Sequence, residues 1–177
     1  HQQQAVVVAA AQAGSEAAFR ELVQAWHRRL TAHAWRLLGD GEAARDVAQA
    51  AWLEIARSLR HLRDPQAFSA WAYRITSRRA AAHIKRLQSD RRLARDLERE
   101  PRSGAGDAAA ESDLTDALQV AIRNLPPDQR AAIALHHFEG LSVAETAVAM
   151  DAPVGTIKTR LMHARLKLKA ALEGDLP

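Results

Sequence analysis

A cluster of cationic and hydrogen-bonding side chains occupies the predicted helix over residues 153–169, near the end of the chain. No acidic residue occurs between positions 152 and 172, whereas Lys, Arg, Thr and His side chains recur along this stretch. Lys and Arg neutralise phosphates, and side chains with donors and acceptors read base edges in the major groove of DNA. The residue types therefore suit a helix that lies in a DNA major groove, although charge alone would favour the solvated face of a helical bundle.

The stretch before this helix predicts the first helix and the turn of a helix-turn-helix. Ser142 is a suitable N-cap, and Glu145, three residues later, can complete a capping box. We expect this helix to turn Ala144, Ala147 and Val148 inward. The tight connection to a second helix is what favours DNA binding over a simple bundle.

Pro153 is predicted to lie in the first turn of the second helix, after a short break at residues 150–152. Proline is tolerated there because the first backbone N–H groups of a helix have no partner inside it. Apolar residues then repeat at helical spacing on one face, which we expect to be buried. These residues are Ile157, Leu161, Ala164 and Leu168.

The composition indicates an all-α protein. The 177 residues are rich in Ala, Leu and Arg and poor in Gly and aromatic residues. The net charge is only +4, so the arrangement of the charges matters more than their sum. The chain has no cysteine, which excludes disulfides and thiolate chemistry and fits a cytoplasmic location.

The sequence lacks the patterns typical of a membrane protein or an enzyme. No apolar run approaches the roughly 20 residues that cross a bilayer, so we expect no membrane insertion. The apolar stretch 5–11 is too short for a signal peptide and lacks its basic flank. The histidines show no paired metal-ligand spacing, and the glycines form no phosphate-binding loop. We therefore expect no catalytic site, no metal and no cofactor.

Three helices are predicted in the first part of the chain. The first carries one continuous apolar stripe and is expected to end at Gly39. The second follows Asp40, and the third begins at Asp64 and Pro65, an N-cap with proline at the first helical position, and runs to about Leu87. The stripe of the first helix comprises Phe19, Leu22, Val23, Trp26 and Leu30, and the inward set of the second comprises Ala44, Val47, Ala48, Ala51, Ile55 and Leu59.

Residues 101–113, PRSGAGDAAAESD, separate two helical parts of the sequence. Pro, Gly, Ser, Ala and acidic residues without apolar periodicity are typical of a flexible connector. We therefore predict two small helical domains, at 1–100 and 114–177, joined by this linker. In the second domain, helices are expected at 114–125 and 128–138, ahead of the helix-turn-helix.

The third helix of the first domain combines an acid-free stretch, residues 65–89, with aromatic side chains. Bases stack on aromatic rings and phosphates attract cations, so this combination suits single-stranded nucleic acid. Phe68 and Trp71 fall at core spacing with Ile75 and are expected to be buried, which leaves Tyr73 as the exposed ring. Taken alone, this helix fits DNA contact and ordinary core packing equally well.

The two parts together resemble a known family over residues 19–172. The first part ends in AFSAWAYRITSRRAAAHIKR, and the second reads LPPDQRAAIALHHFEGLSVAETAVAMDAPVGTIKTRLMHARLKL. In this order they closely resemble the extracytoplasmic-function (ECF) class of bacterial sigma factors. The resemblance implies a chain that carries only sigma regions two and four, binds core RNA polymerase and directs it to promoter DNA in the cytoplasm. It also implies an anti-sigma factor as an inhibitory partner.

The resemblance assigns the helix over 153–169 to the minus-35 promoter element. Relatives often carry an aromatic residue or Arg where this chain has Met162 and His163, which leaves the preferred promoter sequence open. Lys158, Thr159, Met162 and His163 would face the bases, Arg160 and Arg165 would contact phosphates or pack the helix, and His136 would contact the DNA backbone.

The resemblance also implies a minus-10 surface on the third helix and a core-polymerase-binding surface on the second. Relatives often have Asn in place of Arg78, Asp in place of His83, and a Gln-Glu pair where this chain has Gln49 and Ala50. The implied minus-10 residues are Phe68, Trp71, Tyr73, Arg74, Arg78, Arg79, His83 and Arg86, and the implied core-binding residues are Asp46, Val47, Gln49, Trp52 and Glu54, of which Val47 also fits the protein core.

Two other functions are compatible with part of the pattern. A helix-turn-helix regulator that acts without polymerase should carry a receiver or ligand domain, and the first part of the chain shows no βαβ alternation. A structural adaptor made of two helical bundles is the other alternative. Within the sigma-factor interpretation, the two domains can fold together or be clasped by an inhibitor while polymerase is absent.

Overall fold

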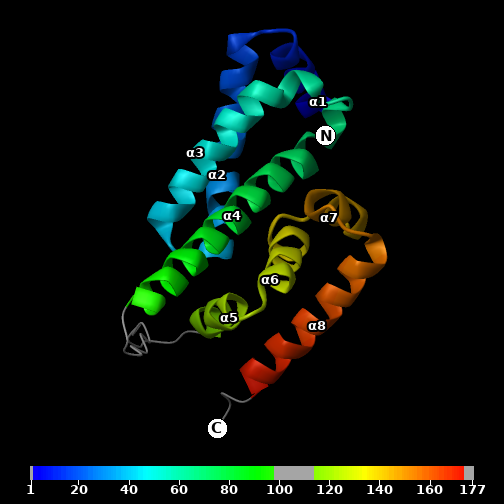
Figure 1. Ribbon diagram of the computed structural model, residues 1–177. Helices are drawn as coiled ribbons and strands as arrows, with labels where there is room; N and C mark the ends of the chain where they lie inside the picture. The colour runs from blue at the N-terminus through cyan, green and yellow to red at the C-terminus, as the bar shows by residue number, and fades with distance from the viewer. Residues whose placement is uncertain (1, 98–113, 174–177) are drawn as a thin grey trace.

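The computed structural model describes residues 2–97 and 114–173, and all regular elements in these ranges are helical (Figure 1). The all-α prediction is thus confirmed, whereas the predicted linker at 101–113 lies outside the described residues. We call α1–α4 the first block and α5–α8 the second block. The elements are α1 (Gln2–Gln12), α2 (Glu16–Leu38), α3 (Gly41–Ser58), the short turns η1 (Leu59–His61) and η2 (Pro65–Ala67), α4 (Phe68–Leu97), α5 (Leu114–Arg123), α6 (Pro127–Ile133), the π-helical turn η3 (Ala134–Phe138), α7 (Val143–Met150) and α8 (Val154–Glu173).

The boundary between α2 and α3 follows from its capping residues, as the sequence predicts. Gly39 ends α2 in the left-handed conformation with a φ of 71°, which costs glycine little because it has no Cβ. Asp40 then caps α3, and its Oδ1 accepts hydrogen bonds from the backbone N–H groups of Glu42 and Ala43 at 2.8 and 3.0 Å. The two helices can therefore reverse direction within two residues.

The predicted apolar stripes of α2 and α3 form the core of the first block. Leu22, Trp26 and Leu30 are buried, and every member of the predicted inward set of α3 is buried as well. The Trp26 ring meets Phe68 and Tyr73 of α4 edge to face, with ring centroids 5.5 and 5.7 Å apart. This aromatic cluster fixes α4 against α2.

α4 is the central helix of the molecule, since it packs against α2, α3 and α7. As predicted, Asp64 caps its entry and accepts from the backbone N–H of Gln66 at 2.9 Å, although the first turn, η2, is a 3-10 turn. The predicted end near Leu87 is wrong, because α4 continues to Leu97. Residues 88–97 contain no Gly or Pro and consist largely of good helix formers, so nothing in them ends the helix.

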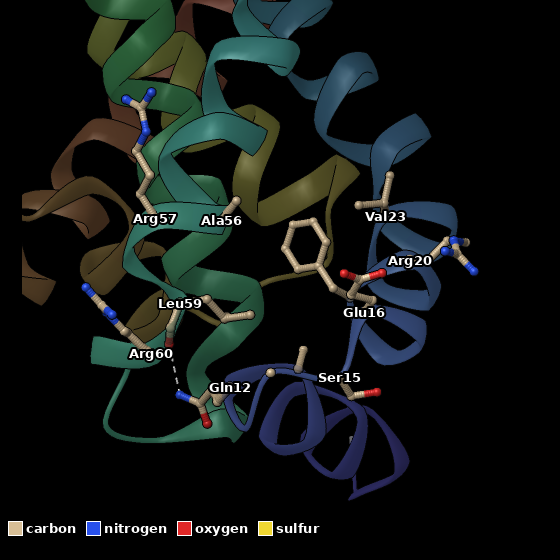
Figure 2. Close-up of a pocket in the computed structure, with 12 residues that line it drawn as sticks. Gln12, Ser15, Glu16, Arg20, Val23, Ala56, Arg57, Leu59 and Arg60 are labelled. Carbon is tan, nitrogen blue, oxygen red and sulfur yellow. Dashed lines mark hydrogen bonds between the residues drawn. The ribbon is translucent and has the colours of Figure 1, made fainter.

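The sequence patterns do not predict α1, because its apolar residues run consecutively instead of at helical spacing. α1 packs along α2, and Val8 is fully buried. Gln12 joins α1 to the turn η1 that follows α3, because its Nε2 donates to the carbonyl of Leu59 at 2.9 Å (Figure 2). The same Nε2 donates to the carbonyl of Leu62 at 2.6 Å. An open cavity of about 920 Å³ lies beside this junction, and none of the predicted site residues lines it.

The second block has its own core beneath the helix-turn-helix. Ile133 of α6, Ala147 of α7 and Leu161 of α8 are buried together there. Between α6 and α7 the backbone N–H of Glu139 bonds to the carbonyl of Ala134, five residues back, so the helix widens into η3 before it ends. Figure 1 shows α6 and α7 between α4 and α8, so the second block lies directly against the first.

Candidate nucleic-acid interface

The helix-turn-helix begins with the capping box that the sequence predicts. Ser142 Oγ accepts from the backbone N–H of Glu145 at 3.1 Å, and Glu145 Oε2 accepts from the backbone N–H of Ser142 at 2.8 Å. α7 ends after two turns, and Asp151 takes the left-handed conformation with a φ of 52°. α8 starts at Val154, so a break and a restart occur as predicted but one residue later: the break covers 151–153, and Pro153 precedes the first turn of α8 instead of lying in it.

The predicted inward face of α7 is wrong in part. Ala147 is buried, but Ala144 is exposed and Val148 is 53% exposed. Thr146 and Ala149 are buried in their place. α7 contacts α4 of the first block as well as α6 and α8, so its buried face is shifted from the face that the helix-turn-helix alone would cover.

The outward side of α8 carries the predicted base-facing residues. Lys158, Thr159 and His163 are exposed, and Met162 is 50% exposed. The predicted apolar face lies on the opposite side, where Ile157, Leu161 and Ala164 are buried and Leu168 is partly buried. α8 therefore presents donors, a cation and a thioether to solvent from a helix that its own core holds in place.

Arg160, Arg165 and His136 are tied to neighbouring parts of the second block. Arg160 Nη2 lies 2.7 Å from Asp128 Oδ2, and the Arg165 guanidinium donates to His137 Nε2 at 3.2 Å. Burial, followed by the charges of His136 and Arg165, lowers the pKa of His137, which suits its role as a neutral acceptor. His136 Nδ1 donates to the carbonyl of Leu141 at 2.7 Å.

The aromatic residues predicted for the minus-10 surface are mostly covered. Phe68 is fully buried, as its spacing predicts, whereas Trp71, for which the spacing also predicts burial, is half-buried. The prediction that Tyr73 is the exposed ring is wrong, because Tyr73 is also fully buried. Its ring packs against Trp26 and His33 of α2, and its hydroxyl donates to Glu139 of the second block at 2.5 Å. Packing on two sides of α4 buries a wider arc than one stripe predicts.

The cations of α4 divide into paired and exposed ones. Arg74 Nη2 lies 3.1 Å from Asp151 Oδ2 in the turn of the helix-turn-helix. Arg79 pairs with Glu54 of α3, with Nη2 and Oε2 2.6 Å apart. Arg78, His83 and Arg86 are exposed or half-exposed and form no ion pair within the described residues, and Arg86 Nη2 lies 3.4 Å from His83 Nδ1.

The surface predicted to bind core polymerase is smaller than the sequence suggests. Asp46 and Gln49 are exposed on α3, but Val47 and Trp52 are buried in the core with 5% and 9% exposure. Leu53 is 55% exposed beside them, and sequence analysis missed it. A large apolar residue that falls off the inward stripe of its helix was the available signal.

The two blocks are joined by polar contacts that sequence analysis also missed. Glu139 accepts from Arg36 Nη1 and from the Tyr73 hydroxyl, and its side chain is 6% exposed. Arg130 donates to the carbonyl of Leu37 at 2.5 Å and to that of Leu125, within its own block, at 3.0 Å. Nothing in the local sequence around these residues indicates partners about 100 positions away.

His33 is a buried titratable group beside these contacts. It is fully buried, and its Nε2 lies 2.8 Å from Ser77 Oγ. Burial, with the charge of Arg36 as the second cause, lowers the pKa of His33 to about 3. The imidazole is therefore neutral in the folded chain at any pH near 7.

His33 should make the protein less stable in mild acid. The unfolded chain takes up a proton at His33 below its ordinary pKa of about 6.5, whereas the folded chain does so only near pH 3. Between these values stability falls as the pH falls, and a decrease from pH 7.5 to 5 should cost about 2 kcal/mol. Urea unfolding at both pH values measures this difference. His33→Gln should reduce it, whereas His163→Gln, at an exposed position, should leave it unchanged; equal pH dependence in the wild type and His33→Gln would refute the assignment.

Comparison with known proteins identifies the family. Residues 22–90 match Sigma-70 region 2, and residues 115–168 match Sigma-70, region 4. The chain is 31% identical over 171 residues to the ECF RNA polymerase sigma-E factor of Escherichia coli, which covers 90% of this chain and 89% of the relative. This protein is an ECF sigma factor. The sigma factor is also 30% identical over 179 residues to the RNA polymerase sigma-H factor of Pseudomonas aeruginosa. This match spans 92% of the present chain and 90% of the relative.

Solved structures share the arrangement of the sigma factor. CnrH in complex with the cytosolic domain of CnrY matches it with a TM-score of 0.70 and 26% identity, over 98% of this chain and 99% of CnrH. The sigma factor RpoE from Bartonella quintana, solved with the anti-sigma factor NepR, has the same fold with a TM-score of 0.70 and 23% identity, over 89% and 98% of the two chains.

Family membership makes the sigma factor a non-enzymatic transcription protein. None of its described helices has the length and apolar character needed to cross a membrane. Within residues 2–97 and 114–173, no group of three His, Cys, Asp or Glu side chains is placed to hold a metal ion.

Proposed function

We propose that this sigma factor binds core RNA polymerase in the cytoplasm and places it on promoters through two DNA-binding surfaces. α8 reads the minus-35 element, and α4 contacts the opened minus-10 element. The domains run over 1–100 and 114–177, with 101–113 as the linker. The observation that carries this proposal is the outward side of α8, where Lys158, Thr159, Met162 and His163 lie together and form no ion pair with the other described residues.

Recognition of the minus-35 element rests on two kinds of side chain. Lys158 and Thr159 supply donors for base edges, Met162 suits the methyl group of thymine, and His163 offers a single hydrogen bond. A side chain that reads a base edge contributes about 1–3 kcal/mol of discrimination at its base pair. Arg160 and Arg165 orient α8 through Asp128 and His137, and His136 stays close enough to the surface to contact the DNA backbone.

The minus-10 surface uses α4 in two ways. Phe68, Trp71 and Tyr73 form the support beneath the surface, because they are buried or half-buried against α2. The exposed or half-exposed cations attract the phosphates of the separated strand. This second group contains Arg74, Arg78, Arg79, His83 and Arg86.

Core polymerase binds the exposed face of α3 in this proposal. Asp46 and Gln49 supply polar contacts and Leu53 supplies an apolar one. Val47 and Trp52 hold α3 from beneath, and Glu54 acts through its ion pair with Arg79. An exposed leucine flanked by polar side chains has the composition of a protein interface.

An anti-sigma factor is the proposed inhibitory partner. CnrH, whose structure was solved with the cytosolic domain of CnrY, has the same arrangement over nearly its whole length. In this sigma factor α7 of the second block packs on α4 of the first. We call this the closed arrangement, and it covers part of the surface proposed for the minus-10 strand. A protein that stabilises the closed arrangement would therefore keep the sigma factor off the promoter.

In vitro transcription with core RNA polymerase on a pool of promoters tests the proposal. The intact chain should support initiation at a subset of promoters. Lys158→Glu should reduce transcription from those promoters about 10- to 100-fold, because it removes a contact worth about 1–3 kcal/mol and adds repulsion. Lys167→Glu is the matched control, since Lys167 is exposed on α8 about 180° around the helix axis from Lys158.

Each outcome of this experiment has a distinct meaning. If the intact chain supports no initiation on any promoter, the proposed function is wrong. If the chain binds specific duplexes without polymerase and never joins it, the helix-turn-helix regulator is the better description. If Lys158→Glu and Lys167→Glu behave alike, α8 does not read the minus-35 element through this face.

A further inference from the structure

A carboxylate of the second block occupies a polar site on the first block. Glu139 lies at the end of η3, and its side chain is 6% exposed. One of its oxygens accepts from Arg36 Nη1 of α2, and the other accepts from the Tyr73 hydroxyl of α4 at 2.5 Å. The Arg36 guanidinium also lies over the ring of Phe138, 4.7 Å from its centroid. The site therefore consists of a cation and a phenol that converge on one anion.

The donors of this site belong to the first block and need an anionic partner. Burial, followed by the hydrogen bond to Glu139, raises the pKa of the Tyr73 phenol above its ordinary value, so the hydroxyl remains a donor. Arg36 supplies a planar guanidinium cation that matches the geometry of an oxyanion. If the second block moved away, both donors would lose the Glu139 carboxylate and would be open to water or to another anion.

A DNA phosphate offers the same chemistry as the Glu139 carboxylate. Both groups present two anionic oxygens, and a guanidinium donates to either in the same forked geometry. Tyr73 is also followed directly by Arg74, within the acid-free stretch 65–89. Arg74 too is paired with an acidic residue of the second block, Asp151, at 3.1 Å. Two acidic side chains of the second block thus lie where a nucleic-acid backbone would find cations.

We propose that Arg36 and Tyr73 bind a backbone phosphate of the opened promoter strand, and that Glu139 fills this site while the two blocks are closed on each other. The inference rests on the proposed function, since it requires a promoter strand on α4. It adds to that function a phosphate contact from Arg36 of α2 and an internal competitor for the same site, Glu139. DNA and the second block then exclude one another at this site, so closure of the chain inhibits it even without a partner protein.

Binding of the holoenzyme to fork-junction DNA tests this proposal. Core polymerase with the full-length chain is titrated with labelled DNA whose non-template strand is single-stranded across the minus-10 element. Arg36→Ala should weaken binding about 5- to 30-fold and reduce the salt dependence by about 0.7, the value for one phosphate contact on a single strand. Arg36→Lys should recover part of the affinity. Glu139→Gln should leave binding unchanged or strengthen it.

If the Arg36–Glu139 contact only holds the two blocks together, Arg36→Ala should not weaken the binding of holoenzyme to DNA. Both partners would then only hold the closed form, so Arg36→Ala and Glu139→Gln would both leave holoenzyme binding unchanged or strengthen it. That result would overturn the proposal. Arg20→Ala, at an exposed arginine near the start of α2, is the control for a general loss of positive charge. Core affinity, measured separately for each variant, distinguishes failure of this inference from failure to form holoenzyme.

Uncharged DNA linkages identify the partner of Arg36. Phosphates of the single strand are replaced one at a time by methylphosphonates. At one position the wild-type holoenzyme should lose affinity by the same factor as Arg36→Ala, and there Arg36→Ala should cause no further loss. If Arg36→Ala weakens binding equally at every substituted position, Arg36 contacts a carboxylate of the polymerase instead, and the proposed phosphate site is wrong.

Discussion

Trp26→Ala should lower the free energy of unfolding by about 3–5 kcal/mol, the range for removing a large aromatic side chain from a core. Trp26 is 4% exposed and meets both Phe68 and Tyr73 edge to face, so its loss leaves a cavity between α2 and α4. Urea denaturation monitored by circular dichroism measures the change. A loss of this size is a large fraction of the stability of an ordinary domain.

The matched control for this variant is Trp35→Ala on the same helix. Trp35 is 38% exposed, so its replacement should cost far less than that of Trp26. The Trp26 variant should also lose minus-10-dependent transcription, because Phe68 and Tyr73 lose the surface that fixes α4. Equal costs for the two variants would show that the aromatic cluster does not support the first block.

Leu161→Ala should destabilise the second block by about 2–5 kcal/mol and abolish recognition of the minus-35 element. Leu161 is 2% exposed and packs with Ile157 and Ala147 beneath the helix-turn-helix. Without it, the outward face of α8 keeps its residues but loses the packing that orients them. Urea unfolding and transcription from a promoter with an essential minus-35 element measure the two effects.

Leu166→Ala offers a control of the same residue type five positions along α8. Leu166 is 60% exposed, so the same truncation leaves no cavity and should change stability by less than about 0.5 kcal/mol. If Leu166→Ala proves as harmful as Leu161→Ala, the assignment of the inner and outer faces of α8 is wrong. A normal minus-35 preference in Leu161→Ala would contradict the role of this core.

The sequence predicts most of the helices, because capping residues and apolar stripes are formed by residues close together in the chain. Gly39 and Asp40 set one boundary, and the capping box at Ser142 sets another, through contacts within three or four residues. The stripes of α2, α3 and α8 are recovered because each helix buries one continuous face. α1 is missed because its apolar residues are consecutive and form no periodic stripe. The length of α4 is underestimated because its last turns carry no apolar stripe, although no Gly or Pro ends the helix before Leu97.

The candidate site is predicted less completely, because contacts between the blocks decide it. Tyr73 and Val148 are misjudged, since the burial of α4 and α7 depends on a neighbour far away in the sequence. In the sequence, Glu139 and Arg36 look like ordinary charged surface residues. They form an ion pair only because the two blocks pack together. The face of α8 is foreseen better, because α8 packs on α5, α6 and α7 of its own block.

The π-helical turn η3 makes the geometry of the chain sensitive to the removal of a single residue. A π turn holds one residue more than an α turn of the same length, and here it ends next to Glu139. Deleting one residue from 134–138 would let α6 continue as a regular helix and rotate Glu139 by about 100° about the axis. Loss of a single codon would thus move the Glu139 carboxylate away from Arg36 and Tyr73, while every core residue of α8 stays in the chain.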